Sequence, residues 1–246
     1  MRVKLTICYD GTSYCGWQRQ KNGFTIQEAI EQAIEKLTGE KVAVTGSGRT
    51  DSGVHAKGQV AHFDTNSTIP AEKFSFALNP LLPDDIKVLK SELASGSFHS
   101  VHSAKRKTYV YTLYLSPVPI PVYERYATRI DGKVDIEKMK NAIKLFIGEK
   151  DFKAFSSTGS SIKSSIRKIY SLTIKKKGEF ILIKVTGNGF LYNMVRIIAG
   201  TLVAIGKGEI EIENVEKAFL TGKRTYAGKT LAAKGLTLFS VQYKSK

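Results

Sequence analysis

Two kinds of hydrophobic spacing alternate along the whole chain, and they constrain its fold more than any other feature. Apolar and polar side chains alternate one by one over residues 3–9, the period-two pattern of a half-buried strand. Over residues 26–37 the apolar side chains instead recur every three or four positions, as on one face of a helix. A capping box, Thr25-x-x-Glu28, precedes this helix, and Gly39 ends it.

The same alternation continues to the end of the chain. Two strand patterns flank a Lys-Lys-Lys-Gly-Glu turn, which predicts a hairpin and therefore antiparallel pairing. We expect an α+β fold of two similar α/β halves, residues 1–104 and 105–246, with mostly antiparallel sheets packed by helices. Further strands are expected at 42–45, 59–64, 109–115, 166–174, 180–185 and 237–243, and further helices at 70–79, 136–146, 190–205 and 212–220.

Positive charge is concentrated in the second half. The formal net charge is +16, yet residues 1–100 hold 11 Lys/Arg and 11 Asp/Glu, whereas residues 101–246 hold 27 and 11. Such an asymmetry indicates a polyanionic partner, most often a nucleic acid. The alternative is a lysine-rich surface that only keeps the protein in solution.

The loop at residues 46–55 is the segment that bears most directly on function. Three of its glycines bracket Arg49 and Asp51, so its backbone can approach a ligand closely. It is neither a dinucleotide fingerprint, because Asp51 stands where glycine is needed, nor a P-loop, because no Gly-Lys-Ser/Thr ends it. The alternative is that Asp51 only caps its own turn.

Arg196 makes a functional interpretation of this loop stronger. It lies in an apolar helical segment whose own side chains supply no acid. A guanidinium buried there needs a carboxylate from elsewhere to offset its desolvation. Asp51 is the natural candidate, and the rivals are Asp10, Asp64 and Asp151.

A third cluster joins basic and aromatic residues. Lys105 and Arg106 lead into a strand with tyrosines at alternate positions, starting at Tyr109. This pattern suits phosphate contacts beside a stacking platform. It is equally typical of a strand that simply favours aromatic residues.

Several other chemistries lack their residues. The two cysteines, Cys8 and Cys15, do not have zinc-finger spacing, and the four histidines lack a metalloprotease motif. No hydrolase elbow or deaminase motif is found. We therefore expect no metal and no cofactor. Without a signal-peptide pattern or a comfortable membrane span, a cytoplasmic protein is expected.

Together these motifs resemble the tRNA pseudouridine synthase A family almost from end to end. Ser52 departs from the family pattern, which usually has alanine after the aspartate. The matching segments, in family order, are Tyr9-Asp-Gly-Thr-Ser-Tyr-Cys-Gly-Trp17-Gln-Arg-Gln20, Gly48-Arg-Thr-Asp-Ser-Gly-Val-His55, Gly58-Gln-Val-Ala-His-Phe63, Leu78-Asn-Pro-Leu-Leu-Pro-Asp-Asp-Ile86, Phe98-His99, Gly148-x-x-Asp151-Phe152, Met194-Val-Arg196 and Gly235-Leu236.

The resemblance implies a pseudouridine synthase fold with a catalytic cleft between the halves. It implies a cofactor-independent reaction in which the uracil of a tRNA uridine is detached from C1′, turned, and rejoined through C5. Asp51 would be the essential carboxylate, and Arg196 would keep it ionised and oriented. Tyr109 would stack on the target base, Leu236 would form the floor of the pocket, and Arg49 would fill the space left by the flipped base.

The resemblance also implies an RNA surface and a substrate. The substrate uridines would be 38, 39 and 40 of the anticodon arm, and a homodimer would bind each tRNA across both subunits. A non-catalytic RNA-binding or chaperone protein is the alternative, and a synthase acting on other uridines is a third possibility. The residues expected to contact tRNA are Phe98, His99, Lys105, Arg106 and Lys163.

Overall fold

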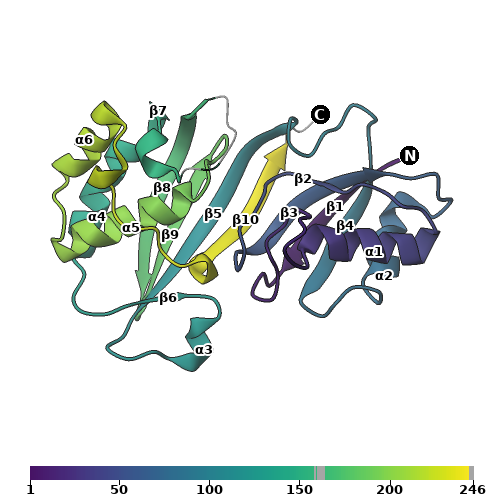
Figure 1. Cartoon of the computed structure of the whole chain (residues 1–246), viewed down its shortest axis with the longest axis horizontal. Helices are drawn as coiled ribbons and strands as arrows, with labels where there is room; N and C mark the ends of the chain where they lie inside the picture. The colour runs from purple at the N-terminus through teal and green to yellow at the C-terminus, as the bar shows by residue number, and fades with distance from the viewer. Residues whose placement is uncertain (158, 160–163, 244–246) are drawn as a thin grey trace. The chain divides into compact units, whose positions relative to one another are not determined.

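The computed structural model describes residues 1–157, 159 and 164–243, which form two compact units (Figure 1). Unit 1 comprises residues 1–105 and 237–246, and unit 2 comprises residues 106–236. The expected halves, 1–104 and 105–246, differ from these units mainly in the C-terminal tail, which the structure assigns to unit 1.

Unit 1 is built on strands in the order β4-β1-β3-β10, with the short β2 added to β3. β1 is antiparallel to both β3 and β4, whereas β10 is parallel to β3, pairing Thr237 with His55. The strands are β1 (Arg2–Tyr9), β2 (Thr45–Gly46), β3 (His55–Asp64), β4 (Ile86–Ala94) and β10 (Leu236–Tyr243), and the helices are α1 (Ile26–Thr38) and α2 (Phe74–Leu78).

Helix α1 begins and ends where its sequence predicts. The Thr25 hydroxyl accepts a hydrogen bond from the backbone N–H of Glu28, and Gly39 ends the helix in a left-handed conformation with φ of 75°. Ile26, Ile30 and their neighbours on the apolar face are buried. The caps contribute about 1 kcal/mol each, and the rest of the stability comes from this buried face.

Unit 2 is built on strands in the order β5-β9-β8-β7, with β6 parallel to β5. The hairpin of β8 and β9 confirms the expected antiparallel pairing. The strands are β5 (Ala104–Leu115), β6 (Thr128–Ile130), β7 (Gly148–Asp151), β8 (Ile166–Lys177) and β9 (Phe180–Gly187), and the helices are α3 (Pro121–Glu124), α4 (Ile136–Ala142), α5 (Met194–Lys207) and α6 (Glu213–Thr221).

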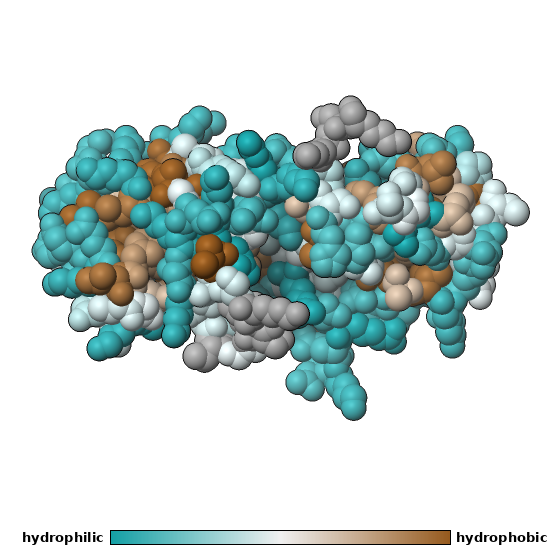
Figure 2. Space-filling view, turned by 90° about the horizontal axis from the view of Figure 1, so that it is seen from above, coloured by the Kyte–Doolittle hydropathy of each residue, from teal (hydrophilic) through white to brown (hydrophobic). Residues whose placement is uncertain are grey.

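One face of the unit 2 sheet carries its core. Tyr111 and Leu113 of β5 lie on the same face as Ile181 and Ile183 of β9, and all four are fully buried. The apolar helix α5 and its neighbour α4 belong to this side (Figure 1). Elsewhere, hydrophilic side chains cover most of the molecular face in Figure 2, and hydrophobic ones gather in separate patches among them.

The α+β class with mostly antiparallel pairing is confirmed, but several boundaries differ from expectation. α5 begins at Met194 and not at residue 190, because Asn193 adopts the left-handed conformation, with φ of 60°. β2 spans Thr45–Gly46, not 42–45. β4, β6, β7 and α3 were not expected. Within the described part of the chain, no helix combines the length and apolarity needed to cross a membrane.

Candidate functional site

The glycine-rich loop at residues 46–55 connects β2 and β3 and is held at its start by β3. The backbone N–H of Ser47 donates to the carbonyl of Val60, at 2.7 Å. The side chain of Gln59 is completely buried and grips Gly48, donating to its carbonyl at 2.7 Å and accepting from its N–H at 3.4 Å. A buried amide that satisfies the backbone in this way fixes the path of the loop.

The residue before the candidate catalytic aspartate is fixed through both its backbone and its side chain. The carbonyl of Thr50 accepts from the N–H of Trp17 at 3.0 Å, and its hydroxyl lies 2.8 Å from the Tyr9 hydroxyl. Tyr9, Trp17 and Thr50 are all buried. Burial raises the pKa of Tyr9, although hydrogen bonds to Thr50 and Gln59 oppose the rise. Tyr9 therefore acts as a neutral anchor.

Two glycines allow these segments to pack against each other. A Cβ atom on Gly46 would lie 2.4 Å from the indole of Trp17, and one on Gly16 would lie 2.4 Å from the carbonyl oxygen of Thr50. Gly16 also has φ of 80°, which favours glycine. Residues 9–17, within the opening motif of the chain, therefore support the loop, a role that the sequence pattern did not reveal.

Asp51 follows this fixed point and is half-buried. Its carbonyl accepts from the N–H of Val54 at 3.1 Å, closing a turn in which Gly53 has φ of 75°. Ser52, the departure from the family pattern, donates its hydroxyl to the carbonyl of Tyr14 at 3.1 Å and so adds a further tie to the opening motif. Arg49 is exposed.

A buried histidine adds a further support that sequence reasoning missed. The Nδ1 atom of His55, at the end of the loop, lies 3.1 Å from the Asp10 carboxylate and accepts from the N–H of Gly11, also at 3.1 Å. The side chains of His55 and Asp10 are 5% and 12% exposed. Their position in the family motifs was visible in the sequence, but their contact was not.

In unit 2, Arg196 lies in the first turn of α5 and is half-buried, not fully buried as expected. Its Nε donates to the carbonyl of Leu231 at 2.7 Å, and an amino group donates to the side-chain oxygen of Asn193 at 2.5 Å. The left-handed Asn193 also donates to Ser157 at 3.0 Å. Two fixed acceptors therefore orient the guanidinium before any carboxylate is considered.

Tyr109 and Leu236 are both buried within unit 2. The ring of Tyr109 packs edge-to-face on Phe190, with centroids 5.2 Å apart. Tyr111, two residues further along β5, bonds to Thr128 at 2.7 Å and donates to the carbonyl of Ala232 at 2.6 Å. Burial raises the pKa of Tyr111, and the charge of Arg196 opposes this rise.

Lys107 stands on the same face of β5 as Tyr109 and was not singled out in the sequence. It pairs with Gly187 of β9. Burial, helped by the positive charge of Arg167, lowers the pKa of Lys107 to about 8. A lysine whose pKa lies this near neutral pH, on the same strand face as the expected stacking tyrosine, is a candidate functional group.

The expected RNA-contacting residues lie in different surroundings. Phe98 packs on Tyr243 with centroids 5.0 Å apart, and Lys4 lies 5.4 Å from its ring centre. His99 lies 4.9 Å from His62, and burial, followed by the charge of His102, lowers its pKa. Lys105 and Arg106 are exposed at the start of β5. Lys163 lies outside the described residues.

The predicted site residues are divided between the two units. The pairing of Asp51 with Arg196 joins the two units and stays a prediction. Unit 1 holds Arg49, Asp51, Phe98, His99 and Lys105, and unit 2 holds Arg106, Tyr109, Arg196 and Leu236.

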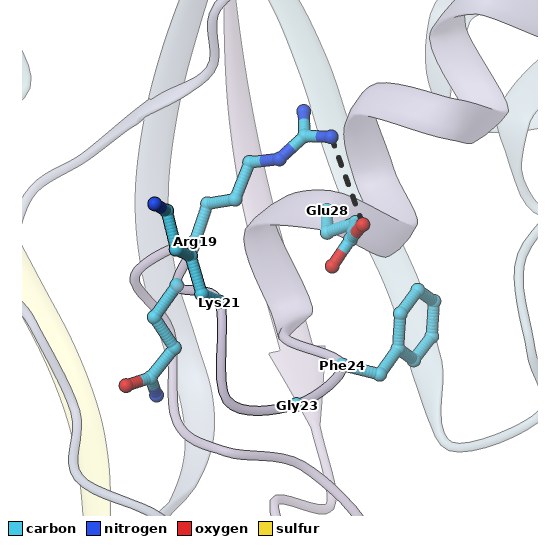
Figure 3. A pocket seen from close by; sticks show the side chains of 6 residues that line it. Arg19, Lys21, Gly23, Phe24 and Glu28 are labelled. Atoms are coloured by element: carbon cyan, nitrogen blue, oxygen red, sulfur yellow. Dashed lines mark ion pairs between the residues drawn. The ribbon is translucent and has the colours of Figure 1, made fainter.

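A hollow elsewhere in unit 1 contains none of these residues. It lies between the chain before α1 and the first turn of that helix and is lined by Arg19, Lys21 and Phe24 among others (Figure 3). Arg19 pairs with Glu28 at 3.7 Å and with Glu31 at 3.1 Å, so its charge is largely neutralised. Among the described residues, no group of three or more His, Cys, Asp or Glu side chains is placed to hold a metal ion.

Comparison with known proteins gives consistent matches over most of the chain. A family model described as tRNA pseudouridine synthase matches residues 6–108 and 142–244. Proteins named tRNA pseudouridine synthase A from Acetivibrio thermocellus and Ruminiclostridium cellulolyticum are 47% and 48% identical over 241 and 243 residues, covering 98% of this chain and 99% of each relative.

A looser structural likeness is to a chain in the crystal structure of the archaeal box H/ACA sRNP Nop10-Cbf5 complex. The sequence identity is 13% and the TM-score is 0.39, over 95% of this chain and 46% of that one. The family match and the relatives that share almost half of their residues lead to one conclusion. This chain belongs to the tRNA pseudouridine synthase A family.

Proposed function

We propose that this chain converts uridine to pseudouridine at positions 38, 39 and 40 in the anticodon arm of tRNAs, without a cofactor, with Asp51 as its catalytic residue. One observation carries the proposal. The loop that presents Asp51 is held by Gln59, Tyr9 and Trp17 within a segment that matches the family. Such preorganisation is what a single catalytic carboxylate requires.

The reaction is an isomerisation and needs no external reagent. The N1–C1′ glycosidic bond breaks, a C5–C1′ bond forms, C5 loses a proton, and N1 gains one. An ionised carboxylate can attack C1′, add to C6, or remove a ribose proton, and each route has the same overall balance. Carboxylates are well suited to glycosidic carbons.

Residues of unit 2 would complete the site. Arg196, already oriented by Leu231 and Asn193, would hold Asp51 ionised. Tyr109 would stack on the target uracil and assist proton transfer at C5, supported from its edge by Phe190. Leu236 would form the apolar floor.

The target base must leave its stack to reach Asp51, at a cost of a few kcal/mol. Arg49 would fill the vacated space, since its side chain is exposed one residue before the buried Thr50. Phe98, His99, Lys105, Arg106 and Lys163 would contact the surrounding RNA. As part of this proposal the enzyme is a cytoplasmic homodimer, because its tRNA substrate is cytoplasmic and the family resemblance implies a dimer.

The test uses an unmodified tRNA transcript labelled with tritium at C5 of uridine. We expect Asp51→Asn to bind this tRNA with unchanged affinity and to release no tritium above background. The matched control is Asp84→Asn, which removes a fully exposed carboxylate of the same unit and should release tritium at the wild-type rate. Normal tritium release by Asp51→Asn would overturn the proposal. Mapping pseudouridine in the product tests positions 38–40.

A further inference from the structure

The unit 2 sheet has a second face, opposite the buried one, that the proposed reaction does not use. β5, β8 and β9 together contain nine Lys/Arg residues and no Asp or Glu. The strand register places Val110, Lys184 and Thr173 side by side on this face, and Lys175 and Lys177 follow along β8. We name this surface, centred on Arg106, Lys168, Tyr170, Lys175, Lys177 and Lys184, the basic face.

An exposed tyrosine lies between cations on the basic face. Tyr170 is 37% exposed and sits in the β-bulge where the register of β8 shifts between Ile169 and Ser171. The Arg106 guanidinium lies 4.7 Å from its ring centre, and the Lys168 ammonium lies 6.0 Å from it. Bulges of this kind re-aim a side chain, here toward solvent. An exposed ring stacked on a guanidinium can extend its stack to an RNA base.

Four of the cations of the basic face form no ion pair within the described part of the chain. Across residues 1–157, 159 and 164–243, no ion pair engages Arg106, Lys168, Lys175 or Lys177. In unit 1, by contrast, Arg2 pairs with Asp64. The acid nearest to the basic face in the strand register is Glu149 of β7, which lies opposite Lys168. These four unpaired cations repel one another, and a polyanion would relieve this repulsion.

The opposite face of the same strands is the buried core face of unit 2. Tyr109, the expected stacking residue for the target base, is buried and lies on the core face, because successive strand residues point to opposite sides. RNA on the basic face therefore lies outside the pocket of the target base. A second copy of this chain is a poor occupant, since a symmetric contact would place like charges together.

We propose that the basic face is a second RNA-binding surface, which contacts phosphates of the tRNA beyond the modified nucleotide and receives an unpaired base on Tyr170. This inference rests on the proposed function for the identity of the RNA. The surface would raise affinity and leave the chemical step unchanged.

The first experiment compares two triple variants of equal charge. Lys168→Gln, Lys175→Gln and Lys177→Gln neutralise the basic face, and the control Lys138→Gln, Lys144→Gln and Lys217→Gln neutralises three exposed lysines of the helical segments. We measure the Kd for an unmodified tRNA transcript against salt concentration, and tritium release at saturating tRNA.

Each lost phosphate contact weakens binding by about 5-fold near 0.15 M salt, so the basic-face variant should bind about 100-fold more weakly, with a salt slope smaller by about 2 to 3. Its kcat should equal that of the wild type, and the control should change Kd by less than about 3-fold. Equal Kd values for the two triple variants would overturn the inference.

The tyrosine is tested separately. Tyr170→Ala should weaken tRNA binding by about 10-fold, whereas Tyr170→Phe should retain wild-type affinity because the ring remains. Vesicles of phosphatidylglycerol serve as a second probe. If the basic-face variant loses vesicle binding but keeps tRNA binding, the surface is for lipid and the inference fails. If wild-type protein binds tRNA through this face yet makes no pseudouridine, the proposed function fails and the inference stands.

Discussion

The hydrogen bond between Tyr9 and Thr50 offers a quantitative test of how the loop that carries Asp51 is held. The two hydroxyl oxygens are 2.8 Å apart, and the residues are 4% and 6% exposed, so water cannot readily replace either partner. Tyr9→Phe leaves the Thr50 hydroxyl buried without this partner, which should cost about 1–3 kcal/mol of unfolding free energy. Thr50→Val should cost less, about 1 kcal/mol, because Gln59 still interacts with the Tyr9 hydroxyl.

The double variant separates the hydrogen bond from packing effects. Replacing both partners removes the unmet hydroxyl, so Tyr9→Phe with Thr50→Val should be less destabilised than the sum of the single variants by about 1 kcal/mol. Urea denaturation monitored through Trp17 fluorescence measures this coupling, because the buried indole lies against the same loop. A coupling below about 0.3 kcal/mol would contradict the anchoring argument.

The same variants connect stability with catalysis. Thr50 directly precedes Asp51, and displacing a catalytic group by about 1 Å can cost about 100-fold in rate. We therefore expect Thr50→Val to lower kcat by about 10- to 100-fold while KM for tRNA changes by less than about 3-fold. Wild-type kcat in a measurably destabilised Thr50→Val protein would show that the loop does not need this anchor.

Three further predictions concern other parts of the site. Gly46→Ala should destabilise the protein by about 1–3 kcal/mol, seen as a lower melting temperature, because the new Cβ would meet the rigid Trp17 ring at 2.4 Å; an unchanged melting temperature would contradict this close packing. Arg196→Lys should lower kcat at least about 10-fold at unchanged net charge, because an ammonium cannot satisfy both Leu231 and Asn193 in the guanidinium geometry; a near-normal kcat would refute it. Burial lowers the pKa of Lys107 to about 8, so between that pH and about 10.4 the unfolded chain binds more protons than the folded protein. The unfolding free energy should therefore rise with pH over this window. Lys107→Met should flatten the rise, and equal slopes for the wild type and the variant would refute the prediction.

The sequence predicted the elements whose signals are local. The capping box at Thr25 and the hairpin near residue 175 needed no information from distant residues, and both were confirmed. β4 was not predicted, because its pattern is broken by exposed apolar residues such as Leu89 and Leu93, at 57% and 61% exposure. The start of α5 was placed too early, because apolar periodicity does not reveal that Asn193 turns left-handed.

The candidate site shows the same division between local and distant information. Asp51 and its glycines form a recognisable local motif, whereas the hydrogen bonds that fix this motif come from residues far away in sequence. Tyr9 is 41 positions from Thr50, and Asp10 is 45 positions from His55. No spacing rule connects such pairs, so their contact becomes visible only in three dimensions.

The assignment of β10 to unit 1 has a consequence for how the chain folds during synthesis. Unit 1 is interrupted by residues 106–236, and its last strand, parallel to β3, is synthesised after the whole of unit 2. Unit 2 is contiguous and can fold as soon as it emerges. The packing around the segment that carries Asp51 is completed only when β10 is present. The Phe239 carbonyl of β10 lies so close to Gly58, just beyond the loop, that a Cβ atom there would be 2.7 Å from it. The unit that is made first is thus the unit that is completed last, so the surroundings of the Asp51 loop are completed only after β10 has left the ribosome.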